Sequence, residues 1–242
     1  MDELPCHVSV FYADVGSQAS RKLSLQTGAS VTIPCHYDRK YVHHKKYWCY
    51  NNGASFGSCT IQAYTSETQG KVTVTDNPAE SLFTVMMKDL QTENTGWYWC
   101  AVEIHRLRDV YENLYITVKS DPDLSVMESR VSGEQGCRVT VQCLYSAAYR
   151  NTQKQWCRFK DKHCYNVGRT ATSQNSAVNV HDDGRGSFSV QMRGLKKSDA
   201  GWYWCGAGDL QVPVHISVYG DAPDSSDSKE CIKPETFCIA HS

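Results

Sequence analysis

The segment Gly96-Trp97-Tyr98-Trp99-Cys100 returns letter for letter as Gly201-Trp202-Tyr203-Trp204-Cys205, 105 residues further along the chain. The pair Trp48-Cys49 also recurs, as Trp156-Cys157, at the similar interval of 108 residues. Self-similarity at a nearly constant interval is the mark of a duplicated structural unit. We therefore expect the 242 residues to form two copies of one domain.

The residues around these segments predict strands rather than helices. Apolar and polar residues alternate over 31–35 and 139–143, and again over 81–87 and 187–192. This period of two is typical of half-buried strands. Short polar stretches that contain glycine join them, and no long helical periodicity appears. The pattern predicts an all-β protein.

Four cysteines hold matching places in each copy. A tryptophan follows the first cysteine by 13 residues, and the last cysteine follows it by 65 residues in one copy and 62 in the other. This spacing is typical of an immunoglobulin sandwich, in which the tryptophan packs on a disulfide between the sheets and a tyrosine precedes the second cysteine by two residues. We predict two tandem V-type immunoglobulin β-sandwich domains, 1–119 and 120–219, followed by an acidic, stalk-like tail, 220–242. The core disulfides would be Cys35–Cys100 and Cys143–Cys205.

The other two cysteines of each copy predict a second, shorter disulfide. Cys49 with Cys59 and Cys157 with Cys164 would join neighbouring strands across 10 and 7 residues. Zinc ligation is the alternative, but no C-x-x-C pair exists, so we expect disulfides and an oxidising, extracellular compartment. Cys6, Cys137, Cys231 and Cys238 allow three pairings, of which we favour Cys231–Cys238.

Composition and motifs exclude several classes of function. The formal net charge is −1 and the pI is about 6.7, which argues against a nucleic-acid-binding protein. The sequence contains no G-x-S-x-G, H-E-x-x-H or phosphate-binding loop, so we expect no enzyme, no cofactor and no metal. There is no run of 18 apolar residues that would cross a membrane.

Two further expectations concern paired side chains. The tryptophans that flank Tyr98 and Tyr203 are expected to pack within their own sheet or against arginine stems rather than to form an exposed ledge. An Asp before the second core cysteine often pairs with a cation in V-type domains. Arg185 is therefore expected to pair with Asp199, whereas Lys71 would meet only Asn94.

Several segments resemble the polymeric immunoglobulin receptor family. The first domain shares the segments 30–37, 46–49, 87–90 and 96–100, and the second resembles the two-domain form of that receptor at 156–158, 182–185 and 208–214. The additional short disulfide is also found in CMRF-type leukocyte receptors, some of which bind phospholipid. The similarity covers roughly residues 20 to 219.

The resemblance implies binding rather than catalysis. It implies capture of polymeric immunoglobulin at an epithelial surface, transcytosis, and release as secretory component in mucosal immunity. The full-length protein would be a single-pass plasma-membrane receptor, and this chain its extracellular ectodomain or a secreted form. In that family the loop between the second and third strands makes the main contact. The residues that the resemblance and the charge pattern single out are Arg39, Lys40, Tyr41, His43, His44, Lys45 and Lys46, with Arg106, Arg108 and Tyr111 from the loop before the last strand.

The basic loop at 37–46 has other interpretations. Its formal charge of +3 fits a solvated turn that only aids solubility. It also fits attraction to phospholipid head groups, since each cation near an anionic surface contributes about 1 kcal/mol. Its histidines permit metal binding or release controlled by pH, although Asp38 is their only carboxylate neighbour in the loop.

Overall fold

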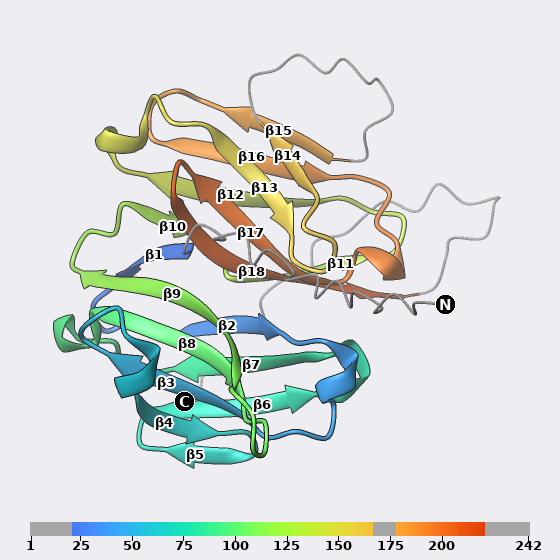
Figure 1. Cartoon of the computed structure of the whole chain (residues 1–242). Helices are drawn as coiled ribbons and strands as arrows, with labels where there is room; N and C mark the ends of the chain where they lie inside the picture. The colour runs from blue at the N-terminus through green and yellow to red at the C-terminus, as the bar shows by residue number, and fades with distance from the viewer. Residues whose placement is uncertain (1–20, 167–177, 221–242) are drawn as a thin grey trace, which may run out of the picture.

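The computed structural model describes residues 21–166 and 178–220 (Figure 1). Within these residues the chain forms strands and short 3-10 turns and contains no α-helix. The first half consists of β1 (Arg21–Gln26), β2 (Val31–His36), β3 (Lys46–Asn51), β4 (Thr60–Tyr64), β5 (Glu67–Gln69), β6 (Val72–Asn77), β7 (Leu82–Met87), β8 (Gly96–Val102) and β9 (Val110–Lys119). The second half consists of β10 (Leu124–Val126), β11 (Arg130–Glu134), β12 (Val139–Tyr145), β13 (Lys154–Arg158), β14 (Cys164–Asn166), β15 (Val178–Asp182), β16 (Ser187–Met192), β17 (Gly201–Ala207) and β18 (Leu210–Tyr219).

Each half folds into a sandwich of two sheets, which confirms the all-β prediction of two V-type immunoglobulin domains. In the first sandwich, the sheet β2-β7-β6-β5 faces the sheet β1-β9-β8-β3-β4. In the second, β10-β12-β16-β15 faces β14-β13-β17-β18, and β11 adds to β18. Six 3-10 turns connect strands: η1 (Arg39–Tyr41), η2 (Phe56–Ser58), η3 (Pro78–Glu80), η4 (Thr92–Asn94), η5 (Ala147–Tyr149) and η6 (Lys197–Asp199).

The duplicated segments form the same core in both sandwiches. Trp48 is fully buried and stacks on Tyr98 with ring centroids 5.0 Å apart, and Trp156 stacks on Tyr203 at 4.9 Å. The tyrosine hydroxyls donate to the carbonyl oxygens of Asn94 and Asp199, each over 2.9 Å. This tyrosine corner is a hallmark of the immunoglobulin sandwich and closes the turn that enters β8 or β17.

The predicted ion pair between Arg185 and Asp199 is wrong, because both residues serve the backbone of their own turns. The Asp199 carboxylate accepts the backbone N–H of Lys196 over 2.8 Å, and the N–H of Arg185 donates to Asp183 over 2.7 Å. In the first sandwich Lys71 does find a carboxylate, that of Asp89.

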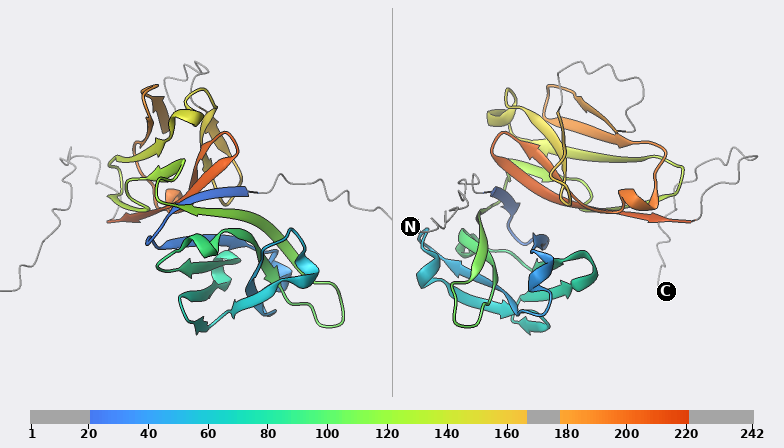
Figure 2. Two further views of the ribbon diagram at one scale, coloured as in Figure 1. Left: turned by 90° about the vertical axis from the view of Figure 1, so that its left-hand side faces the viewer. Right: turned by 45° about the vertical axis from the view of Figure 1, so that its right-hand side comes forward.

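The two sandwiches lie side by side and share strand β1 (Figures 1 and 2). β1 pairs along its whole length with β9 and meets β18 at a single register position, Lys22 opposite Leu210. Phe159, Trp202 and Trp204 of the second sandwich belong to the same buried cluster as the first core. These tryptophans therefore pack as expected, with the Arg21 guanidinium 5.3 Å from the Trp204 ring, but their cover comes partly from the other sandwich.

Candidate ligand-binding surface

The loop between β2 and β3 is anchored from inside the first sandwich by Lys46. Its side chain is 1% exposed, and its ammonium group donates to the carbonyl oxygen of Val42 over 2.7 Å and pairs with Asp76 at 2.9 Å. The Tyr37 ring lies 4.2 Å from the same nitrogen. Lys46 therefore holds the loop in place and presents no charge to a ligand, in contrast to its expected role in the exposed basic cluster.

The second sandwich repeats this anchor at the corresponding positions. The Lys154 ammonium, also 1% exposed, donates to the carbonyl oxygens of Arg150 and Thr152 over 3.0 and 2.7 Å and lies 3.4 Å from Asp182. Burial and the hydrogen bond to Asp182 raise the pKa of the Tyr145 hydroxyl to about 12, so it remains a donor. The signal in the sequence was the 108-residue interval that relates Lys46 to Lys154. We did not use it.

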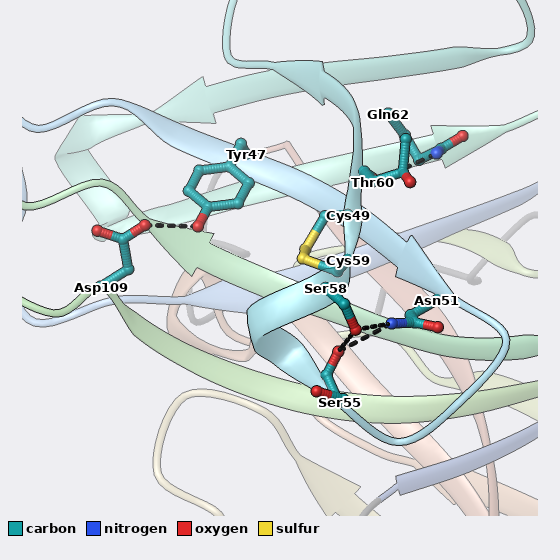
Figure 3. The surroundings of a disulfide bond; sticks show 9 residues. All are labelled: Tyr47, Cys49, Asn51, Ser55, Ser58, Cys59, Thr60, Gln62 and Asp109. Atoms are coloured by element: carbon teal, nitrogen blue, oxygen red, sulfur yellow. Dashed lines mark hydrogen bonds between the residues drawn. A yellow bond between two sulfur atoms is a disulfide. The ribbon is translucent and has the colours of Figure 1, made fainter.

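The loop between β8 and β9 lies directly against the first loop. The backbone N–H of Glu103 donates to the carbonyl oxygen of Lys45 over 2.8 Å. Asp109 braces the loop, because its carboxylate accepts the Tyr47 hydroxyl over 2.6 Å and the N–H of Ile104 over 2.9 Å (Figure 3). Burial and this carboxylate raise the pKa of the Tyr47 hydroxyl above its ordinary value. The two loops thus form one continuous, fixed surface.

The exposed cations of these two loops form what we call the basic tip: Lys40, His43, Lys45, Arg106 and Arg108. Lys40 lies 3.4 Å from Asp38, whereas Lys45, Arg106 and Arg108 have no ion-pair partner within 4 Å in the described part of the chain. Tyr41 and His44 are half-buried and pack edge to face at 5.4 Å. Of the remaining predicted contacts, Arg39 is exposed but lines a cleft toward the second sandwich.

Apolar side chains adjoin the basic tip. Leu107 is 75% exposed, and Tyr111 is 48% exposed with its ring stacked on Phe56 at a centroid distance of 3.9 Å. The Cys49–Cys59 disulfide holds the η2 turn that carries Phe56, and the Asn51 amide donates to Ser58 over 2.7 Å (Figure 3). The sequence analysis selected Tyr111 but not Phe56, because only the folded chain brings them together.

The described residues contain four disulfides, Cys35–Cys100, Cys49–Cys59, Cys143–Cys205 and Cys157–Cys164, the same pairs that the spacing predicts. Cys137 is also disulfide-bonded. The expected Cys231–Cys238 pair lies outside the described residues. Residues 21–166 and 178–220 hold no cluster of metal-ligating side chains and no helix long and apolar enough to cross a membrane.

The fold and the paired loops define an immunoglobulin variable-type receptor module. The immunoglobulin V-set domain model matches residues 18–118 and 126–219, so the chain belongs to the V-set family. It is also a relative of the polymeric immunoglobulin receptors: it is 30% identical to that of Rattus norvegicus over 193 residues, which are 77% of this chain and 25% of the receptor. The chain thus spans about a quarter of the length of this curated relative. As a member of a receptor family it is not an enzyme.

Two other similarities complete this relationship. The CMRF35-like molecule 9 of Mus musculus is 32% identical over 87 residues, 34% of this chain and 26% of that protein. The crystal structure of the teleost fish polymeric Ig receptor ectodomain shares 42% sequence identity and covers 84% of this chain and 97% of that chain, with a TM-score of 0.39. The resemblance to both receptor groups is confirmed.

Proposed function

We propose that this chain is the extracellular part of a receptor that captures polymeric immunoglobulin for transport across epithelia and release as secretory component. The observation that carries the proposal is the sequence relationship to polymeric immunoglobulin receptors, which runs through both sandwiches. The four disulfides fit an extracellular location, because such bonds persist in oxidising compartments.

The basic tip is the contact surface that we propose for immunoglobulin. Its unpaired cations adjoin exposed Leu107 and Tyr111, and arginine with aromatic side chains is the composition that anchors many protein interfaces. Cations on one end of a domain speed encounter with an acidic partner and act mainly on the association rate. The anchors at Lys46 and Asp109 keep this surface preformed, which lowers the entropy lost on binding.

Surface plasmon resonance with purified polymeric IgM tests this proposal. Changing Lys40, Lys45, Arg106 and Arg108 to Ser is expected to slow association about tenfold and to flatten its dependence on salt. Thermal stability is expected to stay unchanged, since all four side chains are exposed. Unchanged association in this variant would show that the contact lies elsewhere.

The matched control removes four exposed cations outside both loops, Lys88, Arg138, Arg185 and Arg193, also by changes to Ser. It alters the net charge by the same amount and is expected to bind immunoglobulin as the parent does. An equal loss in both variants would mean that net charge rather than the basic tip governs association.

Recognition of phospholipid head groups is the second candidate function. It is favoured by Leu107, which stands 75% exposed between Arg106 and Arg108, because an apolar side chain among cations suits an anionic membrane surface. Vesicles that contain phosphatidylserine form the second arm of the same experiment. Binding to vesicles without binding to IgM would replace the first proposal with this one.

A further inference from the structure

A second basic region lies in the cleft between the two sandwiches. This cleft has a volume of about 560 Å³, within the range of small-molecule sites. The first sandwich contributes His36, Arg39 and the turn 79–82, and the second contributes 158–160, 197–198 and 200–202. Both sandwiches therefore supply walls to one site.

The charge of the lining is strongly unbalanced. Four cations, Arg39, Arg158, Lys160 and Lys197, line the cleft, and Glu80 is the one carboxylate among its lining residues. Arg158 is held by the carbonyl oxygen of Ser198 and lies 3.7 Å from Asp161. In the described part of the chain, Arg39 and Lys160 form no ion pair within 4 Å, so each retains its donors for a ligand. Like charges on the walls of a partly enclosed cleft repel one another unless an anion lies between them.

The floor of the cleft is aromatic. Phe159 and Trp202 are 9% and 8% exposed, and the backbone N–H of Phe159 donates to the carbonyl oxygen of Trp202 over 3.0 Å. His36 meets the Phe159 ring edge to face at 6.4 Å, and Arg21 lies 5.3 Å from the ring centre. The floor is therefore fixed by contacts from both sandwiches. It offers apolar ring edges beneath the cations.

We propose that this cleft binds an acidic oligosaccharide. The carboxylate or sulfate of the sugar lies between Arg39 and Lys160, where a guanidinium fork and an ammonium group match its oxygens. The apolar side of the sugar ring lies over Phe159 and Trp202. The site is separate from the basic tip and does not depend on immunoglobulin capture. Because Arg39 and Lys160 belong to different sandwiches, the ligand also joins the two.

Isothermal titration calorimetry on the two-domain protein tests the site with 3′-sialyllactose as the carboxylate ligand and a heparin-derived disaccharide as the sulfate ligand. We expect at least one of them to bind and neutral lactose not to bind. Arg39→Ser with Lys160→Ser is expected to weaken that binding at least tenfold, while Lys88→Ser with Arg193→Ser leaves it unchanged. Quenching of tryptophan fluorescence, with Trp202 in the floor, provides a second readout.

Several results would overturn the assignment. They are failure of both acidic sugars to bind, equal loss in the control variant, and binding of inorganic sulfate or a poly-glutamate peptide as tight as that of the sugar. Lys160→Ser alone is expected to leave capture of IgM unchanged, and the four changes at the basic tip to leave sugar binding unchanged. Failure of either proposal is thus seen independently of the other.

Discussion

Lys46 and Lys154 show how single buried charges shape the loops of this protein. Each ammonium group lies inside a sandwich, pairs with one carboxylate and donates to a carbonyl oxygen of the loop that precedes its strand. Removing one partner of a buried pair is costly, because it leaves the other charge desolvated and uncompensated. The loops therefore take their conformation from the core, and their exposed cations have no part in it.

Asp76→Asn tests the anchor in the first sandwich. The amide can still accept the Tyr37 hydroxyl, which donates to Asp76 over 2.9 Å, but the charge opposite Lys46 is lost. We expect the free energy of unfolding in urea to fall by about 3 kcal/mol. Adding Lys46→Met should restore part of it. The exposed pair Lys22–Asp209 provides the control: Asp209→Asn should cost less than about 1 kcal/mol. Equal effects of the two changes would show that Lys46 is effectively solvated.

His215 predicts a dependence of stability on pH. Burial lowers the pKa of its imidazole below 6.5, Arg130 lowers it further and Glu80 opposes them; the Trp202 ring lies 4.9 Å away. Between the folded and unfolded pKa values the unfolded chain binds more protons, so stability is complete above pH 6.5 and is lost as pH falls through the folded pKa. The melting temperature should drop more between pH 7.5 and pH 5.5 in the parent than in His215→Gln. Parallel curves would contradict this.

The strands and turns around the short disulfides act as local clamps. Cys49–Cys59 ties β3 to the start of β4 and fixes η2, whose Phe56 supports Tyr111. Closing a span of 10 residues contributes about 2 to 3 kcal/mol on the chain-entropy estimate. The apolar part of the proposed immunoglobulin contact therefore depends on this clamp.

Cys49→Ser with Cys59→Ser is expected to lower the free energy of unfolding by about 2 to 3 kcal/mol and to speed hydrogen exchange in β4. Exchange in the β2–β7 pair should stay slow, because Cys35–Cys100 remains closed. Cys157→Ser with Cys164→Ser is the matched change in the second sandwich and should leave β4 protected. Fast exchange throughout the first sandwich would mean that the clamp is part of its core.

The strand order, the core tryptophans and the tyrosine corners follow from local patterns, so the sequence was sufficient to predict them. Lys46 was assigned to the exposed loop because a lysine beside a basic turn resembles a solvated charge. Its carboxylate, Asp76, is 30 residues away and identifiable only after β6 pairs with β7. Arg39 was placed with the loop, yet the cleft that it lines exists only because the second sandwich lies beside the first. Long-range contacts of this kind leave no local signal.

The two sandwiches are joined over a broad surface rather than by the linker alone. β1 lies between β9 and β18, and the backbone N–H of Asp123 in the linker donates to Ser24 over 2.8 Å (Figures 1 and 2). Phe159, Trp202 and Trp204 supply the apolar contact. Each sandwich also has its own disulfides and tryptophan-centred core. Folding of each unit is therefore separable from their association.

Trp204→Ala tests this association. Trp204 is 4% exposed and packs against Phe159 and Arg21, and loss of a buried tryptophan typically costs 3 to 5 kcal/mol. Because the core at Trp156 is untouched, we expect the second sandwich to remain folded while the contact between sandwiches opens. The radius of gyration from small-angle X-ray scattering should increase. Trp99→Ala is the matched control, since Trp99 holds the same place in the repeat but packs within the first sandwich against Tyr47 and Cys49. It should destabilise the first sandwich without separating the two. If Trp204→Ala lowers stability and leaves the radius of gyration unchanged, then Trp204 acts within its own sandwich and other contacts hold the pair together.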